Sequence, residues 1–241
     1  DPDAGRPHRI KLHAAEVQLA EIERLMLPTL RRNESFLART FRLRKETLPA
    51  WLQQREVDGE IRVDRLLNGD SPVGAFRAHL VWDGPSLVFS NADCQLGDMH
   101  ASGKITLNVD QRAPAYHLAG TIENLDYRNG QLDVDGELDT SGLAENLILN
   151  IRSEGTFEGR DIELGPDATM HEISGSYRVG TTYGLPRLTL SNLQVVQGAD
   201  NLSGQGASQP DGRIVLDLTT GRKQIRLTGM LLPMHPDAAR P

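Results

Sequence analysis

The chain has 241 residues, enough for one large β domain or two domains of ordinary size. Its formal net charge is −7 and its pI is about 5.5, which argues against nucleic acid as a partner of the chain as a whole. Hydrophobic residues make up 38% of the chain and aromatic residues only 5%, so a core would consist of aliphatic side chains and glycine. The single cysteine, Cys94, excludes an internal disulfide. Its position favours a small core residue over a nucleophile.

The first periodic segment covers residues 9–27. Apolar residues recur there at spacings of three and four, which predicts an amphipathic helix that ends before Pro28. Such a helix could cap one end of a sheet, or it could lie on a membrane surface or dock a partner. A second short helix is predicted at residues 48–55, with Pro49 near its start.

A basic stretch follows the predicted first helix. It contains few acidic residues, although the chain as a whole is acidic. The stretch could be a solvated surface, or it could meet anionic lipid headgroups. Its basic residues are Arg31, Arg32, Arg39, Arg42, Arg44, Lys45 and Arg55.

Residues 99–109 alternate strictly between apolar or glycine positions and polar positions, which predicts a strand with one apolar face. The two-residue turn Gly97-Asp98 before it predicts a β-hairpin. Upstream, the apolar phase changes by one residue, which predicts a β-bulge near Asn91.

From Val57 onward the same alternation returns again and again, with turn signals between the segments. About a dozen short strands are predicted, and they must be mainly antiparallel because the connections are too short for parallel crossovers. Asn129-Gly130 predicts a second hairpin turn, with Tyr127 opposite Leu132. Glycines in the apolar phase of several strands favour a curled sheet. The predicted fold class is therefore an all-β, mainly antiparallel, curled sheet with a short N-terminal helical segment.

The predicted organisation has three parts. Residues 1–56 form a helical and basic segment, residues 57–230 form the β domain, and residues 231–241 form a disordered tail.

No chemical motif stands out along the chain. The seven histidines are scattered, without the spacing of metal ligands, and phosphate-binding and nucleophile-elbow motifs are absent. Residues 133–137 resemble a fragment of a calcium loop, but they fit the polar phase of a strand better. We therefore expect no cofactor, no metal and no enzymatic activity, with an acidic pair acting on polysaccharide as a distant alternative.

Two long runs carry a family resemblance. They are "LDTSGLAENLILNIRSEGTFEGRDIELGPDATMHEISGSYRV" and "LPRLTLSNLQVVQGADNLSGQGASQPDGRIVLDL", and "DGEIRVDRLLNG" and "ADCQLGDMHASGKITLNV" fit the same pattern. The pattern of glycines and alternation, over roughly residues 50–230, resembles the C-terminal region of AsmA-like proteins. The family's N-terminal membrane helix is not in this chain, which is what we expect of a C-terminal portion.

The resemblance implies a periplasmic protein attached to the inner membrane of a diderm bacterium and linked to outer-membrane homeostasis. It also implies likeness to bridge-like lipid transfer proteins, whose U-shaped sheets carry acyl chains along an apolar interior. The implied partner is a phospholipid or another membrane lipid, and envelope proteins are possible further partners. The expected groove-lining residues are Leu87, Phe89, Cys94, Leu96, Met99, Ile105, Leu107, Val109, Leu118, Ile122, Leu132, Val134, Leu149, Ile151, Ile173, Tyr177, Leu188, Leu190, Leu216 and Leu218.

The alternation by itself leaves a second interpretation open. In a closed β-sandwich the apolar face would meet another sheet about 10 Å away, and the protein would be a structural or protein-binding module of the envelope.

Overall fold

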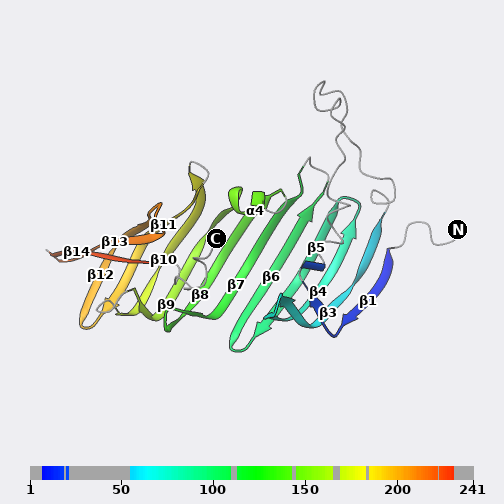
Figure 1. Cartoon of the computed structure of the whole chain (residues 1–241), viewed down its shortest axis with the longest axis horizontal. Coiled ribbons are helices and arrows are strands. Elements are labelled where there is room, and N and C mark those ends of the chain that lie inside the picture. Colours follow the sequence, from blue (N-terminus) through cyan, green and yellow to red (C-terminus); the bar gives the residue numbers. More distant parts are fainter. Residues whose placement is uncertain are drawn as a thin grey trace, which may run out of the picture. The chain divides into compact units, whose positions relative to one another are not determined.

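The computed structural model describes residues 7–18, 20–21, 55–109, 113–142, 145–164, 169–182, 185–221 and 223–230. The described residues form one open, mostly antiparallel sheet (Figure 1). Its strand order is β1-β3-β4-β5-β6-β7-β8-β9-β10-β11-β12-β13-β14, with β2 paired to β3. The strands are β1 (His8–Ala14), β2 (Val17–Gln18), β3 (Glu56–Asn68), β4 (Ser71–Asp83), β5 (Ser86–Leu96), β6 (Met99–Asn108), β7 (Ala115–Tyr127), β8 (Gly130–Ser141), β9 (Arg152–Glu163), β10 (Thr169–Thr182), β11 (Leu185–Gln197), β12 (Asp200–Ser208), β13 (Arg213–Thr220) and β14 (Lys223–Met230).

This architecture confirms the all-β, mainly antiparallel prediction. It does not have the two facing sheets of a closed sandwich, because all the described strands belong to one sheet with open ends.

The chain divides into two units, which are described separately. The first unit comprises residues 1–97, 102–118 and 141–143, and the second comprises residues 98–101, 119–140 and 144–241.

The first unit is held together by a packed apolar cluster on one face of its strands. Leu80, Leu87, Leu107 and Val109 are all at least 92% buried and pack together. Partly buried side chains extend the cluster, among them Phe89 and Trp82, whose indole Nε1 donates to the Gly84 carbonyl at 2.9 Å.

The predicted helix at residues 9–27 is wrong for its first part. Residues 8–14 form β1, which pairs in parallel with β3 from His8↔Val57 to Ala14↔Val63. The spacing of apolar residues gives no information about this partner, which is distant in the sequence. Hydrogen bonds with β3 satisfy the backbone N–H and C=O groups of β1 and stabilise it as a strand. As a result Leu12, predicted to lie on an apolar helix face, is 53% exposed. Several predictions concern residues outside those that the structure describes. They are the later part of the first predicted helix, with Ile22 and Met26, the predicted helix at 48–55 and the basic stretch, both except Arg55, and the tail at 231–241.

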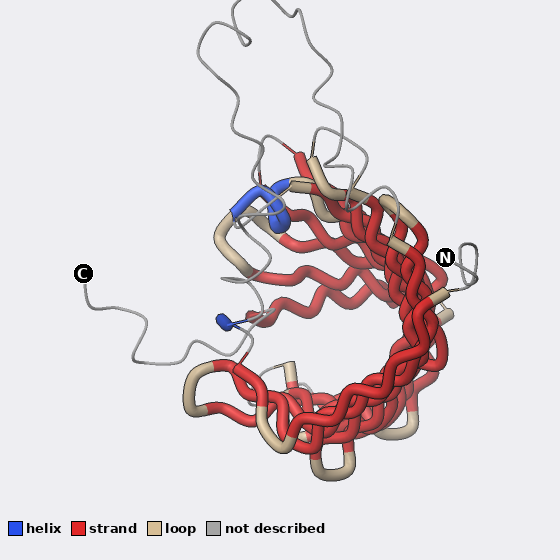
Figure 2. Tube along the Cα trace, turned by 90° about the vertical axis from the view of Figure 1, so that its right-hand side faces the viewer, coloured by secondary structure: helices blue, strands red, loops and turns tan. Residues whose placement is uncertain are grey.

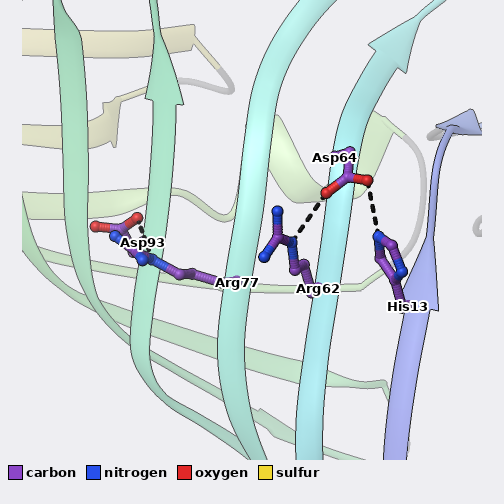
Figure 3. A network of polar contacts seen from close by, with 5 residues as sticks. All are labelled: His13, Arg62, Asp64, Arg77 and Asp93. Carbon is purple, nitrogen blue, oxygen red and sulfur yellow. Dashed lines mark hydrogen bonds and ion pairs between the residues drawn. The ribbon is translucent and has the colours of Figure 1, made fainter.

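Ion pairs on the polar face join neighbouring strands of this unit (Figure 3). Asp64 accepts hydrogen bonds from His13 Nε2 at 2.7 Å and from Arg62 Nε at 2.9 Å, and so ties β1 to β3. These two donors lower the pKa of the Asp64 carboxyl. Arg77 on β4 pairs with Asp93 on β5 at 2.8 Å. All of these side chains are at least partly exposed, so the pairs contribute little stability.

The predicted bulge in β5 is confirmed. Arg77 pairs with Asp93 but His79 pairs with Ser90, so Asn91 and Ala92 together face Ala78. Asn91 has a φ of 50°, a conformation that asparagine tolerates better than most residues.

The second unit contains the antiparallel strands from β8 to β14 and the later part of β7. Its core is a cluster of buried aliphatic side chains on β9 to β13, including Met170, Leu193 and Leu218, none more than 1% exposed.

The strand alternation predicted from Val57 onward includes Leu147, Leu149 and Ile151, and at these three residues it is wrong. Residues Glu145–Leu149 form the short helix α4, blue in Figure 2, and β9 begins only at Arg152. Leucine and isoleucine alternate equally well in a strand and in one turn of helix, so the apolar pattern of this short segment could not separate the two. The helix is fixed by the Asn150 N–H, which donates to the Asn146 carbonyl at 3.0 Å.

The second hairpin turn lies one residue earlier than predicted. β7 ends at Tyr127 and β8 begins at Gly130, so the two turn residues are Arg128 and Asn129, with φ of 51° and 65°. Two positive φ values give the strand twist that a hairpin needs. Gly130 is required for another reason, because a Cβ there would collide with the Arg160 and Asp161 carbonyls of β9.

The turn between β5 and β6 supplies a first test of the fold. Gly97 has a φ of 57° and no heavy atom within 4 Å of the position of a Cβ. Gly97→Val should therefore lower the melting temperature through backbone strain alone, at a cost of about 1–2 kcal/mol, whereas Gly97→Asn should cost less. Equal melting temperatures for the two variants would contradict the positive φ at this position.

Leu107 supplies a second test, because it is 5% exposed within the packed cluster of the first unit. Leu107→Asp should bury an uncompensated carboxylate and destabilise the protein by several kcal/mol. The neighbouring Thr106 lies half-buried in the same strand, and Thr106→Asp should cost much less. Thermal melting followed by circular dichroism measures both, and a Leu107→Asp protein that melts like wild type would refute the packed cluster.

Candidate functional site

The second unit contains an apolar cavity of about 310 Å³. This volume lies at the lower end of the range that small-molecule sites occupy. The cavity is lined by side chains from six strands: Tyr127, Leu132, Val134, Phe157, Ile162, Leu164, Met170, Ile173, Tyr177, Leu188, Leu190, Ile214 and Leu216.

The wall of this cavity carries no charged side chain. Its only side-chain polar atoms are the hydroxyls of Tyr127 and Tyr177, and the Tyr177 hydroxyl lies 3.2 Å from Ser153 Oγ, within hydrogen-bond distance. Met170 and Leu216, each 1% exposed, form the part of the wall that is continuous with the packed core. A wall of this kind favours an apolar occupant and offers few groups that would fix its orientation.

On β9 and β10, apolar residues from both phases of the strand line the cavity, and three strands of this unit carry a non-glycine residue at positive φ. Asn124 on β7, Asp161 on β9 and Asn192 on β11 all have φ between 53° and 54°. On β9, the apolar phase changes at Asp161, so Phe157 at an odd position and Ile162 at an even position line the same cavity, while the pairing with β10 continues without a register shift. On β11, the register with β10 shifts between Ser191 and Gln194, which marks a β-bulge at Asn192.

The positive-φ residue Asn124 of β7 is held by Asp133 of β8. The Asn124 N–H donates to Asp133 Oδ1 at 2.7 Å, and Arg160 Nη2 donates to Asp133 Oδ2 at 2.7 Å. The Asn124 N–H, and secondarily the Arg160 guanidinium, lower the pKa of the Asp133 carboxyl. The part of the sequence that resembled a calcium loop thus uses its first acidic residue to fix a strand. In the described part of the chain, no three His, Cys, Asp or Glu side chains come together as metal ligands could.

The last strand folds back to one end of the cavity. A Cβ on Gly229 of β14 would collide with the carbonyl of Leu164, which lines the cavity. Arg128 in the β7–β8 turn donates to the Met230 carbonyl of β14 and, at 3.3 Å, to the Glu163 carbonyl of β9. The edge strand of the sheet is therefore joined, through one arginine, to strands that lie far from it in the strand order.

The structure brings part of the predicted lining set together. Seven of the predicted residues line the cavity: Leu132, Val134, Ile173, Tyr177, Leu188, Leu190 and Leu216. Leu218 is buried in the adjoining core, while Leu87, Phe89, Leu107 and Val109 belong to the packed cluster of the first unit.

The other predicted lining residues lie elsewhere. Leu96, Leu118, Ile122 and Leu149 are between 36% and 43% exposed. Cys94 is half-buried, its Sγ donates to the Val73 carbonyl at 3.6 Å, and burial raises the pKa of its thiol. Met99, Ile105 and Ile151 are partly buried, and none of the three lines the cavity.

Six lining residues were not among those predicted: Tyr127, Phe157, Ile162, Leu164, Met170 and Ile214. A signal for two of them was present in the sequence. Ile162 and Leu164 follow Asp161 at the point where the apolar phase of β9 changes, just as Ala92 follows Asn91 in β5.

Comparisons of the chain with protein-family models, with curated proteins and with solved structures gave no match. The AsmA-like resemblance therefore stays a prediction. Among the described residues, no helix has both the length and the apolar character needed to cross a bilayer.

The carboxylate of Asp133 supplies a test of its contact with Asn124. Because its pKa is lowered in the folded state, it stabilises the fold above its unfolded pKa, and this contribution disappears as the pH falls through the lower folded pKa. Asp133→Asn should therefore be less stable than wild type at neutral pH, and the difference should shrink below about pH 4. Denaturant unfolding at several pH values measures it, with Asp135→Asn, an exposed position two residues along β8, as the control. A difference independent of pH would show that the charge of Asp133 plays no part.

Proposed function

We propose that the second unit carries or shields the acyl chain of a lipid in its apolar cavity. The observation that carries the proposal is the uncharged wall, in which aliphatic and aromatic side chains from six strands face one space. Each CH₂ group removed from water contributes about 0.8 kcal/mol, so a single acyl chain can contribute roughly 10 kcal/mol before the costs of ordering it. A wall almost without polar anchors would also allow the chain to slide.

The resemblance to AsmA-like proteins adds a cellular setting to this proposal. In that setting the protein is periplasmic, attached to the inner membrane and engaged in lipid transport that supports the outer membrane. The role is that of a carrier and not of an enzyme. The partner is a phospholipid or another membrane lipid.

Lipid extraction tests the proposal directly. Protein purified without detergent should yield lipid at a reproducible ratio when it is extracted with organic solvent and measured by mass spectrometry. A protein that is reproducibly free of lipid in mild preparations, and that takes up none from vesicles, would contradict the proposal and favour a structural role.

Leu188 supplies the matched variants. It is half-buried and lines the cavity, whereas its neighbour Thr189 is exposed and its hydroxyl donates to the Arg178 carbonyl at 3.3 Å. Leu188→Asp should place a charge on the apolar wall and Leu188→Trp should fill the space, so both should reduce the bound lipid severalfold. Thr189→Asp should leave the lipid content unchanged. Folded Leu188 variants with the full lipid content would place the lipid elsewhere.

A further inference from the structure

The strongest unexplained feature near the cavity is Arg128. Its guanidinium carbon lies 5.7 Å from the centre of the Tyr127 ring, and Tyr127 lines the cavity. Its Nη1 donates at 3.3 Å to the carbonyl of Glu163, which stands between the lining residues Ile162 and Leu164. The Arg128 guanidinium does not line the cavity itself, but it lies beside the end of the cavity that Tyr127 and Leu164 form.

Arg128 has no carboxylate partner among the described residues. Both of its acceptors, on Glu163 and Met230, are neutral backbone carbonyls. The Glu163 carboxylate accepts a hydrogen bond from the Asn129 side-chain amide at 2.7 Å. By contrast, many of the other described arginines, such as Arg160 and Arg178, are paired with acidic side chains.

The partial burial of Arg128 means that the lack of a neighbouring negative charge costs free energy. The residue is half-buried, and within the described part of the chain its Nε is a buried polar atom without an acceptor. A guanidinium carries five N–H donors and keeps its charge at any physiological pH, so it cannot respond to burial by losing a proton. An anion beside the guanidinium would supply the negative charge that the two carbonyls do not.

We propose that the ligand of the cavity is an anionic amphiphile whose carboxylate or phosphate binds Arg128 while its alkyl chain lies along the apolar wall. This inference rests on the proposed function. It adds an orientation for the ligand, whose head group lies at the end of the cavity where β14 folds back. The volume of about 310 Å³ suits one alkyl chain better than two.

Two probes that differ only in charge test this inference. Lauric acid, ionised at mildly alkaline pH, and lauryl alcohol have the same chain, and isothermal titration calorimetry gives the affinity of each. The wild-type protein should bind the acid at least tenfold more tightly than the alcohol, because hydrogen bonds to a charged group are the strong ones. Added salt should reduce the affinity for the acid and leave that for the alcohol unchanged.

Variants assign the preference to Arg128. Arg128→Gln should lower the affinity for the acid to that for the alcohol, and Arg128→Lys should keep part of the preference. Arg187→Gln, an exposed position on β11, is the control and should bind both probes like wild type. Thermal melting of each variant shows whether β14 has been released. If Arg128→Gln does not fold, the wild type and Arg128→Lys decide the question, through the ratio of their affinities for the acid and the alcohol and the salt dependence of that ratio.

The outcomes separate this inference from the proposed function. If the wild type binds acid and alcohol equally, or if Arg128→Gln keeps the preference for the acid, the inference is overturned while apolar binding stands. If neither probe binds, the result contradicts both the proposed function and this inference.

Discussion

Backbone pairing between neighbouring strands runs through both units, alongside the packed side chains of their cores. Each described strand from β3 to β13 has a partner on both sides, so its N–H and C=O groups are satisfied whatever covers the apolar face. In the first unit that face is covered by packed side chains such as Leu80 and Leu107. In the second unit, part of the same kind of face is left uncovered by protein. A domain that needed a filled core could not leave this apolar face uncovered. A sheet held together by backbone hydrogen bonds between its strands can.

Irregular residues keep the apolar side chains of several strands on one face of the sheet. Four alternate strands carry an asparagine or aspartate at positive φ: Asn91, Asn124, Asp161 and Asn192. Each is followed by an apolar residue that is buried or half-buried, and the apolar phase of the strand changes there by one residue. At Asn91 and Asn192 this change is a β-bulge. Without the change, Ile162 and Leu193 would point to the polar face. The polar side of the sheet helps to hold one of these irregularities, since Asp133 accepts the free N–H at Asn124.

Much of this could be predicted from the sequence, because alternation is a local signal. The strands, their antiparallel pairing and the bulge at Asn91 follow from residues that lie close together in the chain. Seven of the cavity residues were predicted for the same reason. The other changes of phase were missed although they have the same form as the first, an Asn or Asp followed by an aliphatic residue.

The errors came where a distant partner or a short ambiguous segment decided the structure. β1 is a strand because β3 lies beside it, and nothing within residues 8–14 reports that neighbour. The helix α4 has too few residues for its period to be distinguished from that of a strand. The role of Arg128 is harder still to predict, since its acceptors lie at Glu163 and Met230, and the tertiary approach of β14 brings them together.

Those acceptors have a consequence for how the chain can vary between related organisms. Arg128 is bound to main-chain oxygens, which every amino acid provides, so the contact does not depend on which side chains stand at positions 163 and 230. Substitutions at positions 163 and 230 would leave the contact of Arg128 with these carbonyls intact, whereas a substitution at position 128 would remove it. An alignment would then show an invariant arginine without matching substitutions at positions 163 and 230, which are the paired changes that usually reveal a contact.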